Sequence, residues 1–253
     1  MESVRNSRRL RIFVSERLKR IGYLGIVGVA DLKSVYDALM PIQKRRLEDL
    51  CGGRFQGLLD SGSVICVGIA YPERAIDCID IRLSDGSADK DAWNVYADEY
   101  RRINGYLNAI SSDVSDHFGG VAIPATVERV AVKKVEDYYE MTISHRVVAE
   151  NAGLGWRGKN ELVVNEKFGC ALRFASIITS LPLIRSKRAE GSCGDCEACL
   201  EVCPFLRNKD RIENYRESCR KYIVRLGLRS AVCGKCVKAC YRQGKLANKF
   251  RLS

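Results

Sequence analysis

A periodic pattern of apolar residues predicts four helices. The first runs to about residue 21, and the second begins at Asp31 and ends before Pro41. The third covers residues 91–118, and a short fourth covers residues 144–151. The third carries large side chains at helical spacing: Trp93, Tyr96, Tyr100, Ile103, Leu107 and Ile110. We interpret them as a face that packs on the core, because such a stripe is more typical of a buried helix face than of an aromatic cofactor site.

Short runs of β-branched and aliphatic residues predict strands between these helices. The clearest is residues 64–70, which ends at Tyr71-Pro72, and others are expected at 121–124, 128–133, 161–164 and 170–178. Helices that alternate with strands predict an α/β (α+β) domain. At 253 residues and 46% hydrophobic content, the chain can bury one core and carry a small second module. We expect a cofactor domain over residues 1–188 and a small domain over 189–253.

The second region holds eight of the twelve cysteines. The first run has the spacing C-x2-C-x2-C-x3-C-P, in which three thiolates hold one 4Fe-4S cluster and the fourth binds the other. Crossed ligation then predicts two clusters. We expect the first to be held by Cys193, Cys196, Cys199 and Cys240. We expect the second to be held by Cys203, Cys219, Cys233 and Cys236. The module should therefore be ferredoxin-like and should transfer electrons.

Zinc and disulfides are the alternatives for so many cysteines. Two zinc ions would more naturally use four C-x2-C pairs, and zinc needs no third cysteine followed by x3-C-P. Disulfides are disfavoured because no secretory segment is recognisable and cytosolic thiols stay reduced. Outside the pattern, Cys66 and Cys170 lie in apolar runs and are expected to be buried thiols. We assign no role to Cys51 or Cys78.

The chain has a formal charge of +11, and every charged residue after Ser218 is basic. Two interpretations stay open: a shell that compensates cluster charge, or a docking patch for an acidic redox partner or nucleic acid. No apolar run reaches the length of a membrane span, so we expect no membrane association. The Arg8-Arg9 pair faintly resembles a twin-arginine signal, but charged residues interrupt the stretch that follows. We expect a cytoplasmic protein.

A glycine-rich segment at residues 152–160 reads Ala-Gly-Leu-Gly-Trp-Arg-Gly-Lys-Asn and contains G-x-G-x-x-G. It does not predict a dinucleotide site, because that fingerprint needs a strand before it and a helix after it. Here the predicted order is reversed.

This segment and the order of the cysteines together resemble the epoxyqueuosine reductase family. The resemblance is strong over residues 140–241 and weak over residues 10–125. It implies a nitroreductase-like α/β domain that holds base-off cobalamin beside the first of two 4Fe-4S clusters. An external low-potential donor would supply electrons for reductive removal of oxygen or halide. The residues implied at the corrin site are Gly155, Trp156, Gly158, Lys159 and Asn160.

The sequence departs from that family in three respects. The aspartate that serves as proton donor is missing, and the stretch in its place offers Tyr138, Tyr139 or Glu140. Packing is the alternative for each, and His145 is equally well explained as a hydrogen-bonded core residue. The family's aspartate-tyrosine-histidine stretch is not recognisable near Tyr100. Only thirteen residues follow Cys240, too few for a tRNA-gripping helical repeat, so a tRNA substrate is doubtful.

Three functions follow from these observations. The first is a corrinoid-dependent iron-sulfur reductase of a small molecule. The second is an electron-transfer protein that reduces a separate corrinoid protein or enzyme without binding cobalamin. The third is reduction of epoxyqueuosine in tRNA. We favour the first two.

Overall fold

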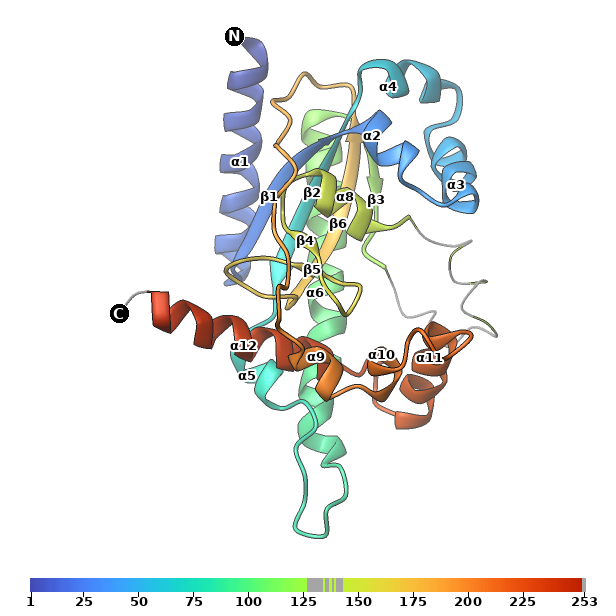
Figure 1. Cartoon of the computed structure of the whole chain (residues 1–253). Coiled ribbons are helices and arrows are strands. Elements are labelled where there is room, and N and C mark those ends of the chain that lie inside the picture. Colours follow the sequence, from blue (N-terminus) through green and yellow to red (C-terminus); the bar gives the residue numbers. More distant parts are fainter. Residues whose placement is uncertain (127–133, 135–136, 138, 140–142, 252–253) are drawn as a thin grey trace.

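A four-stranded antiparallel sheet forms the centre of the α/β part, in the order β1-β2-β6-β3. The strands are β1 (Gly25–Asp31), β2 (Ser63–Ala70), β6 (Leu172–Thr179) and β3 (Val121–Ile123). The computed structural model describes residues 1–126, 134, 137, 139 and 143–251, with side chains up to residue 244. Figure 1 shows helices on both sides of this sheet. The predicted α/β class is confirmed.

Strand β2 is buried along its whole length, and its side chains alternate between two cores. Ile65, Val67 and Ile69 belong to the core covered by α1 (Glu2–Ile21) and α6 (Lys90–Phe118). Val64 and Cys66 belong to the opposite core. That core is covered by α2 (Leu32–Asp37), α3 (Pro41–Cys51), α4 (Phe55–Ser61) and α8 (His145–Asn151). The two-residue period of a strand therefore gives a helix–sheet–helix sandwich.

Side chains at the helix starts explain why three predicted helices begin where they do. The carboxylates of Asp31 and Asp89 each accept a 2.9 Å hydrogen bond from a backbone N–H in the first turn of α2 and α6. Ser144 caps α8 in the same way. Each cap satisfies a donor that the helix itself leaves unpaired. Trp93, Tyr96 and Ile103 of α6 are buried, which confirms the predicted core-facing side.

Some elements differ from the predictions. Strand β1 and helices α3 and α4 were not predicted, and only Val163–Val164 of the expected strand 161–164 forms a strand, β5. It pairs with β4 (Trp156–Arg157) in a small hairpin. The expected strand at 128–133 lies outside the described residues.

The cysteine-rich module contains short helices α9 (Ala198–Glu201) and α10 (Pro204–Arg207), followed by α11 (Tyr215–Leu226) and α12 (Lys235–Arg251). Figure 1 shows it at one end of the sheet, beside α6 and the short helix α5 (Glu73–Asp77). The segment that leads to it passes along β1, where Ser186 exchanges hydrogen bonds with the backbone of Val29. The domain boundary at residue 188 stays a prediction. Among the described helices, none combines the length and apolar character needed to cross a bilayer.

Candidate functional site

Four cysteines, which we call the first thiol set, come from the loop around α9 and from α12: Cys193, Cys196, Cys199 and Cys240. The loop turns at Cys193, whose carbonyl accepts a 3.0 Å hydrogen bond from the Cys196 backbone N–H. Burial, together with repulsion from the other three cysteines, raises the pKa of the Cys199 thiol to about 11. The packing of α12 on α9 therefore brings these four thiols close together.

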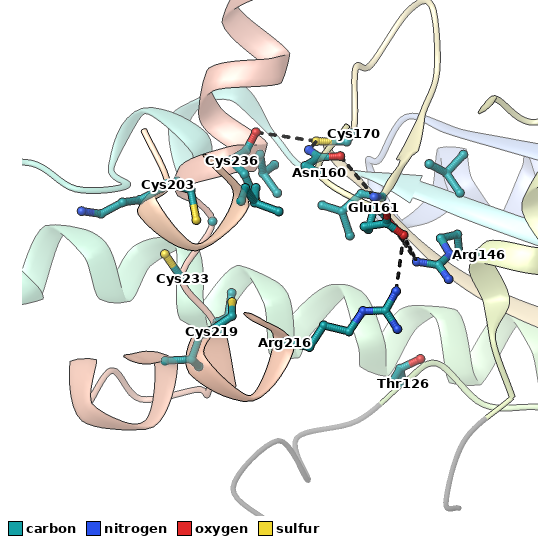
Figure 2. A pocket seen from close by; sticks show the side chains of 18 of the residues that line it. Thr126, Arg146, Asn160, Glu161, Cys170, Cys203, Arg216, Cys219, Cys233 and Cys236 are labelled. Carbon is teal, nitrogen blue, oxygen red and sulfur yellow. Dashed lines mark hydrogen bonds and ion pairs between the residues drawn. The ribbon is translucent and has the colours of Figure 1, made fainter. Parts of the chain in front are cut away.

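The second thiol set consists of Cys203, Cys219, Cys233 and Cys236, the other four cysteines of the predicted pattern. Cys203 precedes α10, which begins at Pro204, and Cys219 lies in α11. Burial raises the pKa of Cys219 to about 12, with added repulsion from Cys233 and Cys203. Figure 2 shows the sulfur atoms of these three residues around a common space. Segments far apart in the sequence thus converge in this set.

The two sets have the donor chemistry that a metal cluster needs. Buried thiols with raised pKa values stay protonated without a cation, because several thiolates close together in a low-dielectric site repel one another. Bound iron would remove that penalty and displace the protons. Among the described residues, no group of Cys, His, Asp or Glu converges as tightly as a single metal ion requires. A cluster is larger than one ion, so its ligands can stand further apart.

Helix α6 supports the loop that carries the second set. The indole Nε1 of Trp93 donates a 2.7 Å hydrogen bond to the carbonyl oxygen of Cys233. Gly234 has φ +82°, and a Cβ there would lie 2.5 Å from the ring of Tyr96. Only glycine combines this backbone conformation with so close an approach. Lys235 completes the contact, with its Nζ 2.9 Å from Asp80 and over the ring of Trp93.

Part of the basic run pairs with the α/β part. Besides Lys235, Arg242 lies 3.2 Å from Asp77, and Arg229 lies 2.9 Å from Asp98. These ion pairs neutralise part of the positive charge within the molecule. A docking role for the remaining charge stays a prediction.

A cavity of about 630 Å³ lies between the sheet, α8 and the cysteine module. All four cysteines of the second thiol set line the cavity. The structure describes the four cysteines of the first set as well, and none of them lines it. The resemblance instead implies a corrin beside the first cluster. Tyr71, Tyr96 and Tyr100 contribute an aromatic wall. The cavity volume is in the range that holds a drug-sized ligand.

Charged side chains form the opposite wall around Glu161. Its Oε2 lies 3.5 Å from Arg146 Nη1 and 3.4 Å from Arg216 Nη2. Arg216 also donates a 2.9 Å hydrogen bond to the hydroxyl of Tyr139. Glu161 adopts φ +64°, an unfavourable conformation for a residue with a side chain. The ion pairs drawn in Figure 2 hold the carboxylate of Glu161 beside the guanidinium groups of Arg146 and Arg216.

Of the five residues predicted at the corrin site, Asn160 lines the cavity. Gly155, Trp156, Gly158 and Lys159 lie in and around the β4–β5 hairpin, outside the cavity walls. Their contact with a cofactor stays a prediction.

The hairpin instead contacts the chain that leads into the cysteine module. A Cβ on Gly191 would lie 2.3 Å from the ring of Trp156, so the backbone packs directly on the indole. Lys159 Nζ lies 3.8 Å from Glu197, which stands between Cys196 and Cys199. The glycine-rich segment therefore holds the module against the sheet domain.

Among the predicted proton donors, Tyr139 lines the cavity. Its hydroxyl accepts the hydrogen bond from Arg216, and a phenolic hydroxyl can also act as a donor. Tyr138 and Glu140 lie outside the described residues.

His145 is a buried, fully hydrogen-bonded residue. Its Nε2 lies 2.8 Å from the carbonyl oxygen of Pro124, and its Nδ1 lies 2.8 Å from the hydroxyl of Ser176. Because the carbonyl can only accept, Nε2 carries the proton and Nδ1 accepts from Ser176. Burial lowers the pKa of His145 to about 4. The imidazole is therefore neutral and oriented, as the core interpretation predicts.

No protein-family model matches the chain. Epoxyqueuosine reductase of Bacillus cereus is 27% identical over 149 residues, which cover 56% of this chain and 34% of that protein. The Bacillus anthracis enzyme of the same name is 28% identical over 156 residues, or 58% and 36% of the two chains. The Escherichia coli (strain K12) enzyme is 39% identical over 62 residues, 24% and 16% of the two chains. The match thus spans about a third of the length of the Bacillus relatives.

Solved structures agree with the fold. The epoxyqueuosine reductase of Streptococcus thermophilus matches 92% of this chain and 66% of its own, with a TM-score of 0.52 and 18% identity. A selenomethionine-labelled epoxyqueuosine reductase matches 92% and 65%, with a TM-score of 0.50 and 20% identity. These comparisons confirm the predicted resemblance to the epoxyqueuosine reductases.

Proposed function

We propose that the chain is an iron-sulfur oxidoreductase of the epoxyqueuosine reductase type. In this proposal each thiol set holds a 4Fe-4S cluster, and the cavity beside the second set is the place of reduction. One observation carries it: the thiols of the second set face a cavity whose other wall bears Glu161, Arg146 and Arg216. An electron carrier there would be in contact with whatever the cavity binds.

The chain's own residues would have three roles in the reaction. The second thiol set would fix a cluster at the cavity wall, supported by Trp93 from α6. Arg146 and Arg216 would bind and orient polar groups of a ligand, since both line the cavity. Tyr139 would donate a proton from its hydroxyl. The apolar surroundings would exclude water and strengthen these contacts.

Cobalamin is the cofactor that we propose for this cavity. Bound there, a corrin would supply the reductive chemistry that removes oxygen or halide. Asn160, Arg146 and Arg216 would hold its polar side chains. Arg146 lines the cavity, and its buried Nε makes no hydrogen bond to the described residues but lies 3.8 Å from Oε1 of Glu150.

An electron-transfer protein without cobalamin is the second candidate. Its support is that four of the five residues implied at a corrin site lie outside the cavity walls. In that case the cavity would receive part of a separate acidic or corrinoid partner.

The names of the relatives suggest the substrate to test first, epoxyqueuosine. The charged wall can bind a small polar molecule, and we keep the free nucleoside as the preferred form. A tRNA that carries the same nucleoside is the alternative.

Anaerobic purification followed by iron, sulfide and zinc analysis tests the cluster part of the proposal. We expect about eight iron and eight sulfide per chain, as two such clusters contain, with two separable EPR signals after reduction. Zinc in place of iron would refute this part. Cys219→Ser should remove the signal of one cluster only.

Titration with cobalamin then separates the two candidates. We expect the shift of the absorption spectrum from base-on to base-off, and weaker binding by Arg216→Ala. Clusters without any spectral response would establish the electron-transfer protein instead. With a chemical reductant, turnover of the free nucleoside against that of modified tRNA decides the substrate form.

A further inference from the structure

Cys170 lies outside the predicted cluster pattern, yet it sits at the contact between the sheet domain and α12. It is 3% exposed and lies two residues before the start of β6. The neighbouring Gly169 has φ +53°, and a Cβ on it would lie 3.2 Å from the carbonyl oxygen of Cys240. This close backbone approach brings the Cys170 side chain to the first thiol set.

Three groups surround the sulfur of Cys170. Asn160 Nδ2 donates a 3.1 Å hydrogen bond to it, and the sulfur lies 3.8 Å from the carbonyl oxygen of Cys236. The third neighbour is Cys240, whose backbone packs on Gly169 and whose thiol interacts with that of Cys170. Figure 2 shows Asn160 and the backbone of Cys236 on either side of this sulfur.

A second hydrogen bond fixes the orientation of the Asn160 side chain. Its Oδ1 accepts a 3.1 Å hydrogen bond from the backbone N–H of Leu162, so its NH₂ group faces Cys170. Because Asn160 donates, the sulfur of Cys170 is an acceptor on that side. Its own proton is left for the carbonyl of Cys236 or the sulfur of Cys240.

We propose that Cys170 is a positioning residue for the first cluster, whose S–H donates a hydrogen bond to the Cys240 thiolate and raises the reduction potential of that cluster. The proposal rests on the proposed function, since it requires Cys240 to be a cluster ligand. A thiolate bound to iron is charged and is a stronger acceptor than the neutral carbonyl of Cys236. Hydrogen bonds to ligand sulfurs favour the more negative, reduced state of a cluster.

The chain from Asn160 through Cys170 to Cys240 also connects the cavity with the first thiol set. Asn160 and Cys170 both line the cavity, whereas Cys240 does not. A ligand that pulls Asn160 away from Cys170 should therefore change the potential of a cluster that it does not touch.

The experiment is an EPR-monitored redox titration of both clusters in the full chain. The variants are Cys170→Ala, which removes the donor, and Cys170→Ser, which keeps an O–H donor in nearly the same place. Cys66→Ala is the matched control, because Cys66 is also fully buried but lies in β2 within the opposite core. Circular dichroism melts check that each variant is folded.

We expect Cys170→Ala to lower one of the two potentials and to leave the other unchanged. Cys170→Ser should restore most of the difference, and Cys66→Ala should match the wild type in both. Cys240→Ser should perturb the EPR signal of the same cluster that responds to Cys170→Ala. Unchanged potentials in folded Cys170→Ala would refute the inference.

Two further outcomes separate this inference from the proposed function. A wild-type chain that binds no iron would refute both together. The other outcome starts from a wild-type chain with normal iron content. If Cys240→Ala keeps the cluster and the double variant Cys170→Ala/Cys240→Ala loses it, Cys170 is a ligand of that cluster. That result would overturn the hydrogen-bonding role and leave the proposed function standing.

Discussion

The indole nitrogen of Trp93 is 2.7 Å from the carbonyl oxygen of Cys233, so a core residue of α6 supports a cysteine of the second thiol set. Replacing Trp93 by Phe keeps an aromatic ring and removes the donor. The buried carbonyl then loses this partner, at a cost on the order of 1–3 kcal/mol. We expect a chelator to remove iron from one cluster faster than it does in the wild type. The decrease in cluster absorbance measures this rate.

Trp156→Phe is the control for that change. Its indole Nε1 is buried without a hydrogen-bond partner among the described residues, so no bond is removed there. Equal rates of iron loss in both variants would show that the Trp93 bond does not support the cluster.

Acid should weaken the fold through His145. Its pKa falls from an ordinary 6.5 to about 4 because it is buried, so the unfolded chain binds a proton that the folded chain rejects. Stability from the neutral imidazole is complete above about pH 6.5 and is lost as the pH falls toward 4, by at most about 3 kcal/mol. Denaturant unfolding at pH 7 and pH 5 measures the loss.

The decrease in unfolding free energy between pH 7 and pH 5 should be smaller in His145→Gln than in the wild type. It should persist in His117→Gln, which changes the chain's other histidine. A pH dependence that is the same in all three proteins would contradict the assignment to His145.

Alkali should weaken the cluster-free protein through its thiols. Burial raises the pKa of Cys219 to about 12 and that of Cys233 to about 11. Because the pKa values of these thiols are raised in the folded chain, the stability that the neutral thiols contribute is complete below about pH 9. It is lost as the pH rises toward 11 or 12. Thermal melts of the cluster-free chain at pH 8 and pH 10.5 should differ more in wild type than in Cys219→Ser. No difference between the two proteins would place Cys219 in a solvated site.

Tyr139→Phe tests the proton donor. The change keeps the ring at the cavity wall but removes the hydroxyl that accepts from Arg216. If the hydroxyl protonates the product, turnover should fall by about 10²-fold or more while iron content stays normal. Tyr215→Phe is the control, since Tyr215 also accepts a hydrogen bond from Arg216. Equal turnover in the two variants would exclude the proposed role of Tyr139.

The long amphipathic elements could be predicted from the sequence because their pattern extends over many residues. Helix α6 shows it best, since its cap at Asp89 and its apolar face agree. Strand β1 was missed because two glycines interrupt its short apolar run. Close packing explains why both positions are glycine. A Cβ on Gly25 would lie 2.4 Å from Gly68 O, and one on Gly28 would lie 2.3 Å from Ala152 O. Such contacts leave no local signal.

Site residues divide in the same way. The cysteine spacing brings the members of each C-x2-C motif together locally, whereas the fold places Cys203 and Cys219 beside Cys233. The contacts of Cys170 and the arginine wall at Glu161 depend on segments that only the fold brings together. Glu161 pairs with Arg216, more than fifty positions along the chain. No periodicity or motif reports a contact of that kind.

The hydrogen bonds between Ser186 and Val29 have a consequence for behaviour in solution. Strand β1 is at the edge of the sheet, and an open edge invites pairing with another chain. Ser186 occupies both the N–H and the carbonyl of Val29, in the middle of that edge. The segment that leads to the cysteine-rich module thus covers this edge and protects the sheet against aggregation. Displacement of the module would expose the edge strand to pairing with another chain.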